Sequence, residues 1–147
     1  MKTVSPFENA GAPGLLRRLG AMFYDSLLLA AVLFFAALPY LLIAGGTPTG
    51  ALSRYLFQLY LLACVFFFFG WFWTHGGQTL GMRAWRIRLA RSDGAGVTWA
   101  DAGKRFALAL CSLLFLGLGY LWVLHDREKL AWHDRLSGTR LIVTRDS

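Results

Sequence analysis

The sequence predicts an all-α membrane protein with three apolar helices and a short basic strand and turn segment between the second and third helices. Of its 147 residues, 56% are hydrophobic and 16% are aromatic, which exceeds the usual composition of soluble globular proteins. Three windows, 26–44, 55–74 and 106–124, contain no Asp, Glu, Lys or Arg. Each would form about 28–30 Å of helix, enough to cross the hydrocarbon core of a bilayer. A signal peptide is disfavoured at 26–44 because its apolar region is normally shorter.

The basic residues predict which side of the membrane each loop occupies. Arg17 and Arg18 precede the first window and six Lys or Arg residues lie in the segment 75–105, whereas the loop between the first two windows has at most Arg54 at its edge. Cations in short loops are retained on the cytoplasmic side, so we expect a cytoplasmic N-terminus and an outer first loop. Five more cations follow the third window. Its length favours a full third crossing; the alternative is a re-entrant segment that turns at "GLGY" and keeps every basic cluster on one side.

Two short runs outside the windows have the pattern of strands. From Trp85 to Leu89, apolar and basic residues alternate, so Trp85, Ile87 and Leu89 would share one face of a strand. "SDGAG" is typical of a turn, and Thr98 with Asp101 predicts a capping box at the start of a helix. The run "TRLIVT" near the C-terminus is rich in β-branched residues. The two runs can pair as a small sheet only if they lie on the same side of the membrane.

Asp25 stands at the edge of the first apolar window, where an ionisable side chain is costly unless it faces protein or water. Arg18 lies seven residues earlier, so two helical turns place both side chains on nearly the same face. Direct pairing over about 10 Å of helical rise is marginal. We therefore expect Asp25 to meet a basic or amide group from another helix, such as Gln58. Asp25 is either a functional site or an interfacial residue that orients its helix.

Three motifs follow one another along the chain: "RLGAMFYD", "GGQTLGMRAWRIRL" and "WHDRLSGTRLIV". Together they resemble the motifs of the RDD family of small membrane proteins, named for one arginine and two aspartates. The resemblance implies a single transmembrane domain at 14–144 after a flexible tail at 1–13, in a multi-pass protein of the bacterial inner membrane. It also implies the functional motif residues Arg18, Asp25, His133 and Asp134, and a loop motif of Gly77, Gln78, Thr79 and Gly81.

Residue types suited to catalysis are not grouped, because no nucleophile, base and orienting residue appear together; no enzyme activity is expected. His75 and His133 could titrate near neutrality, although a plain interfacial role is more common. The histidines lack metal-ligand spacing, and neither a metal nor a cofactor is expected. Because topology explains the cations, the expected partner is an anionic lipid headgroup and not a nucleic acid.

The resemblance suggests transport, with cation/proton exchange as one form of it. Three short helices make a thin wall around any path, so we expect a homo-oligomer or another membrane protein as partner. In this hypothesis Asp25 is the carboxylate that binds the proton or cation. The alternative is a non-transporting scaffold or accessory protein in which Arg18, Asp25 and Asp134 fix helix packing and loop docking.

Overall fold

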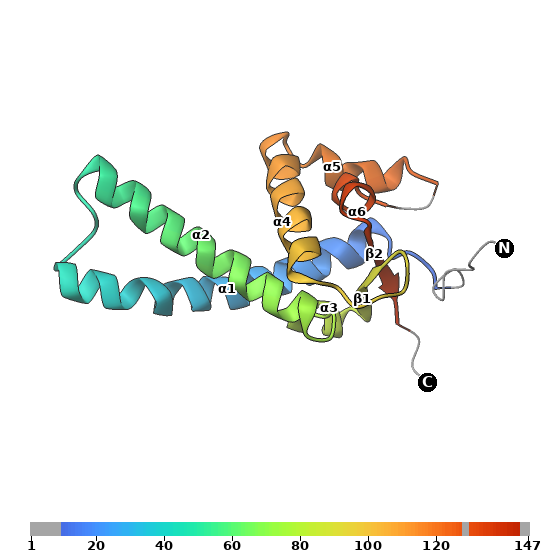
Figure 1. The fold of residues 1–147 in the computed structure, drawn as a ribbon, viewed down its shortest axis with the longest axis horizontal. Coiled ribbons are helices and arrows are strands. Elements are labelled where there is room, and N and C mark those ends of the chain that lie inside the picture. Colours follow the sequence, from blue (N-terminus) through green and yellow to red (C-terminus); the bar gives the residue numbers. More distant parts are fainter. Residues whose placement is uncertain (1–9, 128–129, 145–147) are drawn as a thin grey trace.

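The computed structural model describes residues 10–127 and 130–144, and its longest feature is a hairpin of two helices (Figure 1). α1 runs from Leu15 to Ala44 and α2 from Ala51 to Thr74. Gly45 ends α1 with a φ of 70°, a left-handed conformation that glycine adopts without strain. The elements after α2 gather at the open end of the hairpin, and we call residues 75–144 the cap. Of the tail expected at 1–13, residues 1–9 lie outside the described part of the chain.

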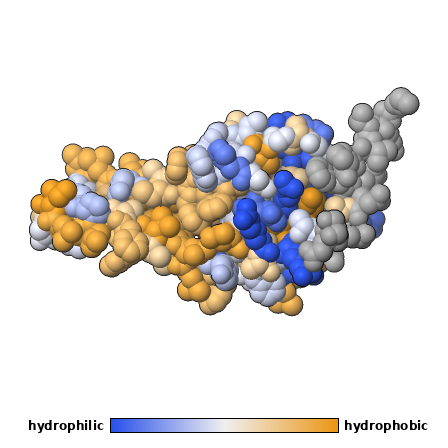
Figure 2. Space-filling model, turned by 90° about the horizontal axis from the view of Figure 1, so that it is seen from below, coloured by the Kyte–Doolittle hydropathy of each residue, from blue (hydrophilic) through white to orange (hydrophobic). Residues whose placement is uncertain are grey.

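Helices α1 and α2 expose apolar side chains over most of their surface. In the described part of the chain these two helices are long and apolar enough to cross a membrane, and the most apolar stretch of α1 contains no buried residue. Figure 2 shows hydrophobic residues over the hairpin arm and hydrophilic residues gathered around the cap. Soluble monomers rarely expose so large an apolar patch, so a bilayer or a partner must cover it. The first two predicted helices are thus confirmed.

The third apolar window, 106–124, does not form a single helix. α4 spans Trp99–Leu114, and the chain then reverses at Leu116 and Gly117, whose φ angles are 58° and 75°. Two short elements follow, α5 (Leu118–Leu121) and the 3-10 helix η1 (Trp122–Leu124). The left-handed pair of residues breaks the helix inside the window, so the prediction of one continuous span is wrong.

A two-stranded sheet joins the beginning of the cap to its end. β1 (Ile87–Arg91) pairs antiparallel with β2 (Thr139–Val143), and Leu89 lies opposite Leu141. Ile87 and Leu89 are 1% and 2% exposed, in agreement with their predicted common face. Because the pairing brings the C-terminal segment back to the loop after α2, the favoured third crossing of the membrane is wrong.

Two tryptophans of the cap rest on glycines of the hairpin. A methyl group built on Gly20 would lie 2.3 Å from the Trp85 ring, and one built on Gly70 would lie 2.4 Å from the Trp99 ring. Trp85 follows the short helix α3 (Leu80–Ala84) and precedes β1, so its predicted place in the strand is wrong. The missing Cβ at both glycines lets the cap approach both helices closely.

The two local motifs predicted before α4 are confirmed. In the turn, Asp93 Oδ1 accepts a hydrogen bond from the Ala95 backbone N–H at 3.0 Å. Thr98 Oγ1 accepts from the Asp101 backbone N–H at 3.3 Å, and the Asp101 carboxylate accepts from the Thr98 backbone N–H at 2.9 Å. This capping box starts α4 and thereby sets which face of the helix carries Arg105, two turns later.

The sheet predicts that its two ends lie on one side of the membrane. In a chain that lacks Cys64 and Cys111, cysteines at Asp93 and Thr144 should react with a membrane-impermeant thiol reagent from the same side, and a cysteine at Thr47 from the other. The positive-inside rule makes the first side cytoplasmic. Labelling of intact cells and of inverted vesicles measures this. Reaction of Asp93→Cys and Thr144→Cys from opposite sides would contradict the paired strands.

Candidate functional site

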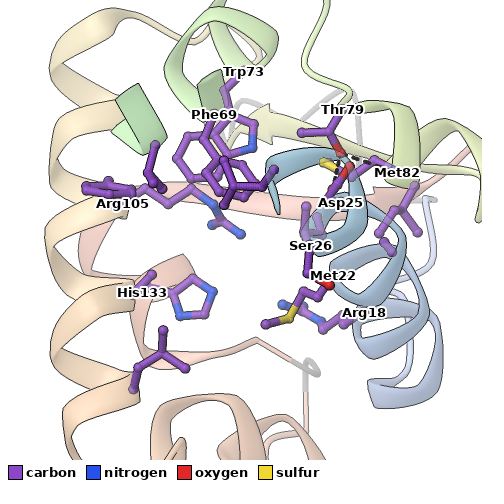
Figure 3. Close-up of a pocket in the computed structure, with 18 of the residues that line it drawn as sticks. Arg18, Met22, Asp25, Ser26, Phe69, Trp73, Thr79, Met82, Arg105 and His133 are labelled. Atoms are coloured by element: carbon purple, nitrogen blue, oxygen red, sulfur yellow. Dashed lines mark hydrogen bonds between the residues drawn. The ribbon is translucent and has the colours of Figure 1, made fainter. Parts of the chain in front are cut away.

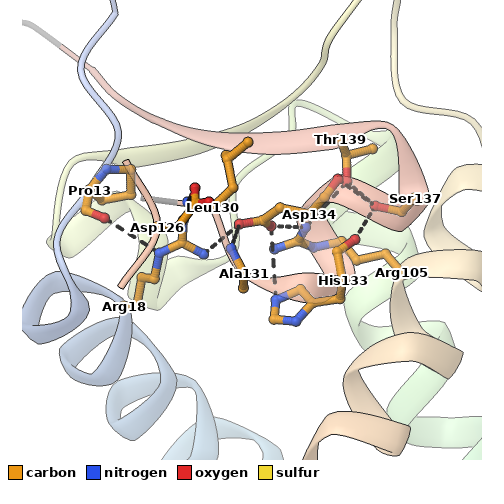
Figure 4. Close-up of polar contacts among 10 residues, drawn as sticks. All are labelled: Pro13, Arg18, Arg105, Asp126, Leu130, Ala131, His133, Asp134, Ser137 and Thr139. Carbon is orange, nitrogen blue, oxygen red and sulfur yellow. Dashed lines mark hydrogen bonds and ion pairs between the residues drawn. The ribbon is translucent and has the colours of Figure 1, made fainter. Parts of the chain in front are cut away.

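Asp134 lies at the centre of a buried charge cluster between α1, α4 and α6 (Trp132–Ser137), as Figure 4 shows. The residue is 1% exposed. Its Oδ2 accepts a hydrogen bond from Arg18 Nη1 at 2.8 Å, and its Oδ1 accepts from Arg105 Nη1 at 2.5 Å. Oδ2 also accepts from the Ala131 backbone N–H at 2.9 Å, so the same carboxylate caps the first turn of α6.

The two guanidinium groups have further partners that extend the cluster. Arg105 Nη1 donates to Thr139 Oγ1 at 3.2 Å, which links α4 to the start of β2. The Arg105 guanidinium also lies over the Trp73 ring of α2, 5.5 Å from its centroid. Arg18 Nε donates to the Pro13 carbonyl at 3.4 Å, just before α1 begins. The Asp134 carboxylate of α6 thus joins α1 of the hairpin to α4 of the cap through charge-assisted hydrogen bonds.

The charges of the cluster set the protonation of Asp134 and His133. Burial alone would raise the pKa of Asp134, but the positive charges of Arg105 and Arg18 outweigh burial and hold its pKa well below its ordinary value. For His133, burial first and the charge of Arg105 second lower the pKa from 6.5 to about 3. His133 is 2% exposed, and its lowered pKa favours the neutral imidazole near pH 7.

His133 should make the stability of the fold depend on pH. Its pKa is lower in the folded chain than in the unfolded one, so the unfolded state binds the extra proton between pH 6.5 and about 3. The contribution of His133 is therefore complete above pH 6.5. Below that pH it should fall by up to about 1.4 kcal/mol per pH unit. Unfolding of the detergent-solubilised protein across this range should show the slope, and His133→Gln should flatten it.

The matched control for this pH dependence is His125→Gln, since His125 is exposed. That substitution should leave the slope unchanged. Equal slopes for the unmodified protein and His133→Gln would contradict a neutral, buried His133.

Asp25 holds the loop motif against α1. It is 4% exposed, and its Oδ2 accepts a hydrogen bond from Thr79 Oγ1 at 2.5 Å while its Oδ1 accepts from the Gly81 backbone N–H at 2.9 Å. Thr79 is the N-cap of α3, where its hydroxyl oxygen accepts from the Met82 backbone N–H at 3.1 Å. Asp25 therefore docks the first turn of α3 onto the membrane helix.

The other two residues of the loop motif support the sheet. The Gly77 carbonyl accepts from the Leu89 backbone N–H at 2.7 Å, and a Cβ on Gly77 would lie 2.5 Å from the Leu89 carbonyl oxygen. Gln78 Nε2 donates to the Ile87 carbonyl at 2.9 Å. The loop motif thus joins β1 on one side and Asp25 on the other, and it needs glycine where the backbone comes closest.

The sequence grouped Arg18 with Asp25, but the structure pairs them with different partners. Arg18 binds Asp134, 116 residues away, and Asp25 binds Thr79 and Gly81. Gln58, the expected partner of Asp25, is exposed. Asp25 does meet groups of another helix, but they are the Thr79 hydroxyl and the Gly81 backbone N–H instead of the Gln58 side chain.

Arg105 is the residue that sequence reasoning missed, because it was counted only as a topology signal. It lies on the same buried face of α4 as Ala102 and Ser112. The pattern that indicates its role is its spacing: Arg105 comes three residues after Ala102, on the face of α4 that packs against protein. Within residues 10–127 and 130–144, no three His, Cys, Asp or Glu side chains converge in the manner of metal ligands.

Residues of the site lie on two sides of a cavity of about 340 Å³ between α1, α2 and α4 (Figure 3). Arg18 and Asp25 line it from α1, and Arg105 and His133 line it from α4 and α6. Most of the remaining wall is apolar. The functional motif residues named from the sequence thus gather around one space, although Asp134 itself lies behind the wall, bound to both arginines.

An apolar helical hairpin with buried charges at one end defines a membrane protein. The sequence matches the model of the RDD family over residues 12–138, and the chain belongs to this family. Neither a search of curated proteins nor a search of solved structures finds a match.

Proposed function

We propose that this RDD-family membrane protein is a transporter or a transporter subunit in which Asp25 binds a proton or a small cation. The observation that carries the proposal is the environment of Asp25: a buried carboxylate in a candidate membrane helix, at the wall of a cavity. Among the described residues its hydrogen-bond partners are a hydroxyl and a backbone amide, and no cationic side chain forms an ion pair with it.

The neutral partners of Asp25 favour reversible binding. A carboxylate paired with arginine, as Asp134 is, stays ionised, and the arginines already bind its oxygens. Asp25 has no such competitor, so a proton or a cation entering the cavity can bind its oxygens at a modest electrostatic cost. Cation/proton exchange, in which one carboxylate binds either ion, is the reaction this arrangement suits best.

Two spanning helices cannot enclose a path for an ion, so the transporter requires more than one chain. The exposed apolar surface of the hairpin supports a homo-oligomer or a complex with another membrane protein in the bacterial inner membrane. The cap with its many cations is placed on the cytoplasmic side, where it contacts anionic headgroups. The exposed leucines at the turn between α4 and α5 support entry of this turn into the bilayer.

A non-transporting scaffold is the second candidate, and a specific observation favours it. Both oxygens of Asp25 are already used to dock α3, and both arginines of the cluster are used to hold Asp134. Arg18, Asp25 and Asp134 therefore each have a structural task, which a packing role alone would explain.

Asp25→Asn separates the two candidates, because it keeps the size of the side chain and removes its charge. Purified protein in liposomes should dissipate an imposed pH gradient when sodium or potassium is added, and Asp25→Asn should abolish this flux while the protein keeps its thermal stability. Asp93→Asn, in an exposed turn, is the matched control and should keep full flux. A scaffold predicts instead no flux from any variant and a lower unfolding temperature for Asp25→Asn.

A further inference from the structure

The cavity between α1, α2 and α4 is larger than the packing of the helices requires. Its volume of about 340 Å³ is more than twice that of an engineered apolar cavity of about 150 Å³ that binds benzene. Apolar side chains from all three helices line it: Met22, Leu29, Val65, Phe69, Phe106, Ala109, Leu110 and Leu113. Water is a poor occupant of such walls, because each water molecule needs two to four polar partners.

The mouth of the cavity opens to the apolar exterior of the hairpin. Leu113 of α4 lines the cavity and remains 54% exposed. Leu29 and Val65, which also line the cavity, belong to the two helices that can span a membrane. In a bilayer the mouth therefore faces hydrocarbon, and an acyl chain is the molecule present there to fill it.

The opposite end of the cavity is polar and offers hydrogen-bond donors. Arg105 is 4% exposed, and Figure 3 shows its guanidinium directed from α4 into the cavity. Its hydrogen bonds to described residues are all made by Nη1, to Asp134 and Thr139. Nε and Nη2 make none of these hydrogen bonds, so they are the Arg105 donors that a ligand in the cavity can reach. An anionic oxygen at this end would satisfy them.

We propose that the cavity binds an acyl chain with an anionic headgroup, whose oxygens accept hydrogen bonds from Nε and Nη2 of Arg105 and whose chain lies along Leu29 and Leu113. The lining residues Arg105 and His133 belong to the cap and the lining residues Leu29 and Val65 belong to the hairpin, which matches the orientation of a lipid in the leaflet next to the cap. Asp25 lines the same cavity, and its carboxylate would repel an anionic headgroup placed beside it. The headgroup therefore lies on the α4 side.

The headgroup can be tested with two ligands that share one chain. The full-length protein in a neutral detergent should bind oleate with an affinity about tenfold or more above that of oleyl alcohol, because charge-assisted hydrogen bonds to Arg105 discriminate between them. Binding is measured by titration of the intrinsic fluorescence. Dibromostearate should quench Trp73, which lines the cavity, and the quenching should be reduced in Trp73→Phe.

The position of the chain is tested by filling the cavity. Ala109→Phe should weaken oleate binding by about tenfold or more, since the ring would occupy the space of several methylene groups. Ala107→Phe is the matched control on the same helix, because Ala107 is exposed and does not line the cavity, and it should leave binding unchanged. If Ala109→Phe does not fold, Trp73 quenching in the unmodified chain still decides the location.

Competition with phospholipids tests whether the natural ligand is a bilayer lipid or a free fatty acid. Displacement of oleate by phosphatidylglycerol, and not by phosphatidylcholine, would assign the site to an anionic lipid of the bilayer; displacement by neither would assign it to a free fatty acid. Equal affinity for oleate and oleyl alcohol would overturn the proposal, as would unchanged oleate binding in folded Ala109→Phe. None of these measurements involves ion flux, so the outcome is independent of the role of Asp25.

Discussion

Asp134→Asn should lower the free energy of unfolding by about 3–5 kcal/mol, the usual effect of removing one partner from a buried ion pair. The substitution keeps the size of the side chain but leaves Arg18 and Arg105 buried next to a neutral amide. It also weakens the acceptor for the Ala131 backbone N–H at the start of α6. Unfolding of the detergent-solubilised protein by denaturant measures the loss.

Asp93→Asn is the matched control, since it makes the same chemical change in an exposed ion pair with Arg91. It should change stability by no more than about 1 kcal/mol. Adding Arg105→Met to Asp134→Asn should recover part of the loss, because one unpartnered buried cation is then removed. A loss below about 1 kcal/mol for Asp134→Asn would mean that the cluster does not hold the cap to the hairpin.

The stability that Asp134 supplies should persist into acid. Its pKa is lowered on folding, so its contribution is complete above its unfolded pKa of 3.8 and is lost only as the pH falls towards the folded pKa. The pH dependence between 6.5 and about 3 therefore belongs mainly to His133 within this cluster.

Local features of the fold could be predicted from the sequence, because each depends on residues close together in the chain. The two apolar helices follow from length and composition, and the capping box of Thr98 and Asp101 follows from a spacing of three residues. The third window misled the prediction because Leu116 and Gly117 are as apolar as the residues of a span. Hydropathy does not record that the chain adopts positive φ angles there.

The candidate site could be predicted in its members but not in its pairings. The RDD motifs named Arg18, Asp25 and Asp134, and all three are buried. Helical periodicity placed Arg18 and Asp25 on nearly the same face without a direct pair, and the tertiary fold joins them to residues 116 and 54 positions away. Such long-range contacts depend on the return of the C-terminal segment to β1, which the third-crossing prediction excluded. Arg105 was counted only as a topology signal, since its partners Asp134 and Thr139 lie in this returning segment.

Gly81→Ala should be the second most damaging single substitution, because a Cβ at this position would lie 2.3 Å from the Ala21 carbonyl oxygen and 2.8 Å from the carboxyl carbon of Asp25. Backbone of α1 cannot retreat as a flexible side chain could, so α3 must move away and the hydrogen bond from the Gly81 N–H to Asp25 is lost. Overpacking typically destabilises by about 1–3 kcal/mol. A lost hydrogen bond to a buried charged group adds about 1.5–3 kcal/mol. Since the two effects overlap, the expected loss in the free energy of unfolding is about 3 kcal/mol.

Gly103→Ala is the control for Gly81→Ala, because a Cβ on Gly103 of α4 meets no atom within 4 Å. The higher helix propensity of alanine should leave the stability unchanged or raise it by up to about 1 kcal/mol. Thr79→Val should give a smaller loss than Gly81→Ala, since it removes the hydroxyl that donates to Asp25 without a clash. If Gly81→Ala were as stable as Gly103→Ala, the loop motif would not be docked on α1 through Asp25. The carboxylate would then be open to ions on both of its oxygens, and the scaffold role of Asp25 would lose its support.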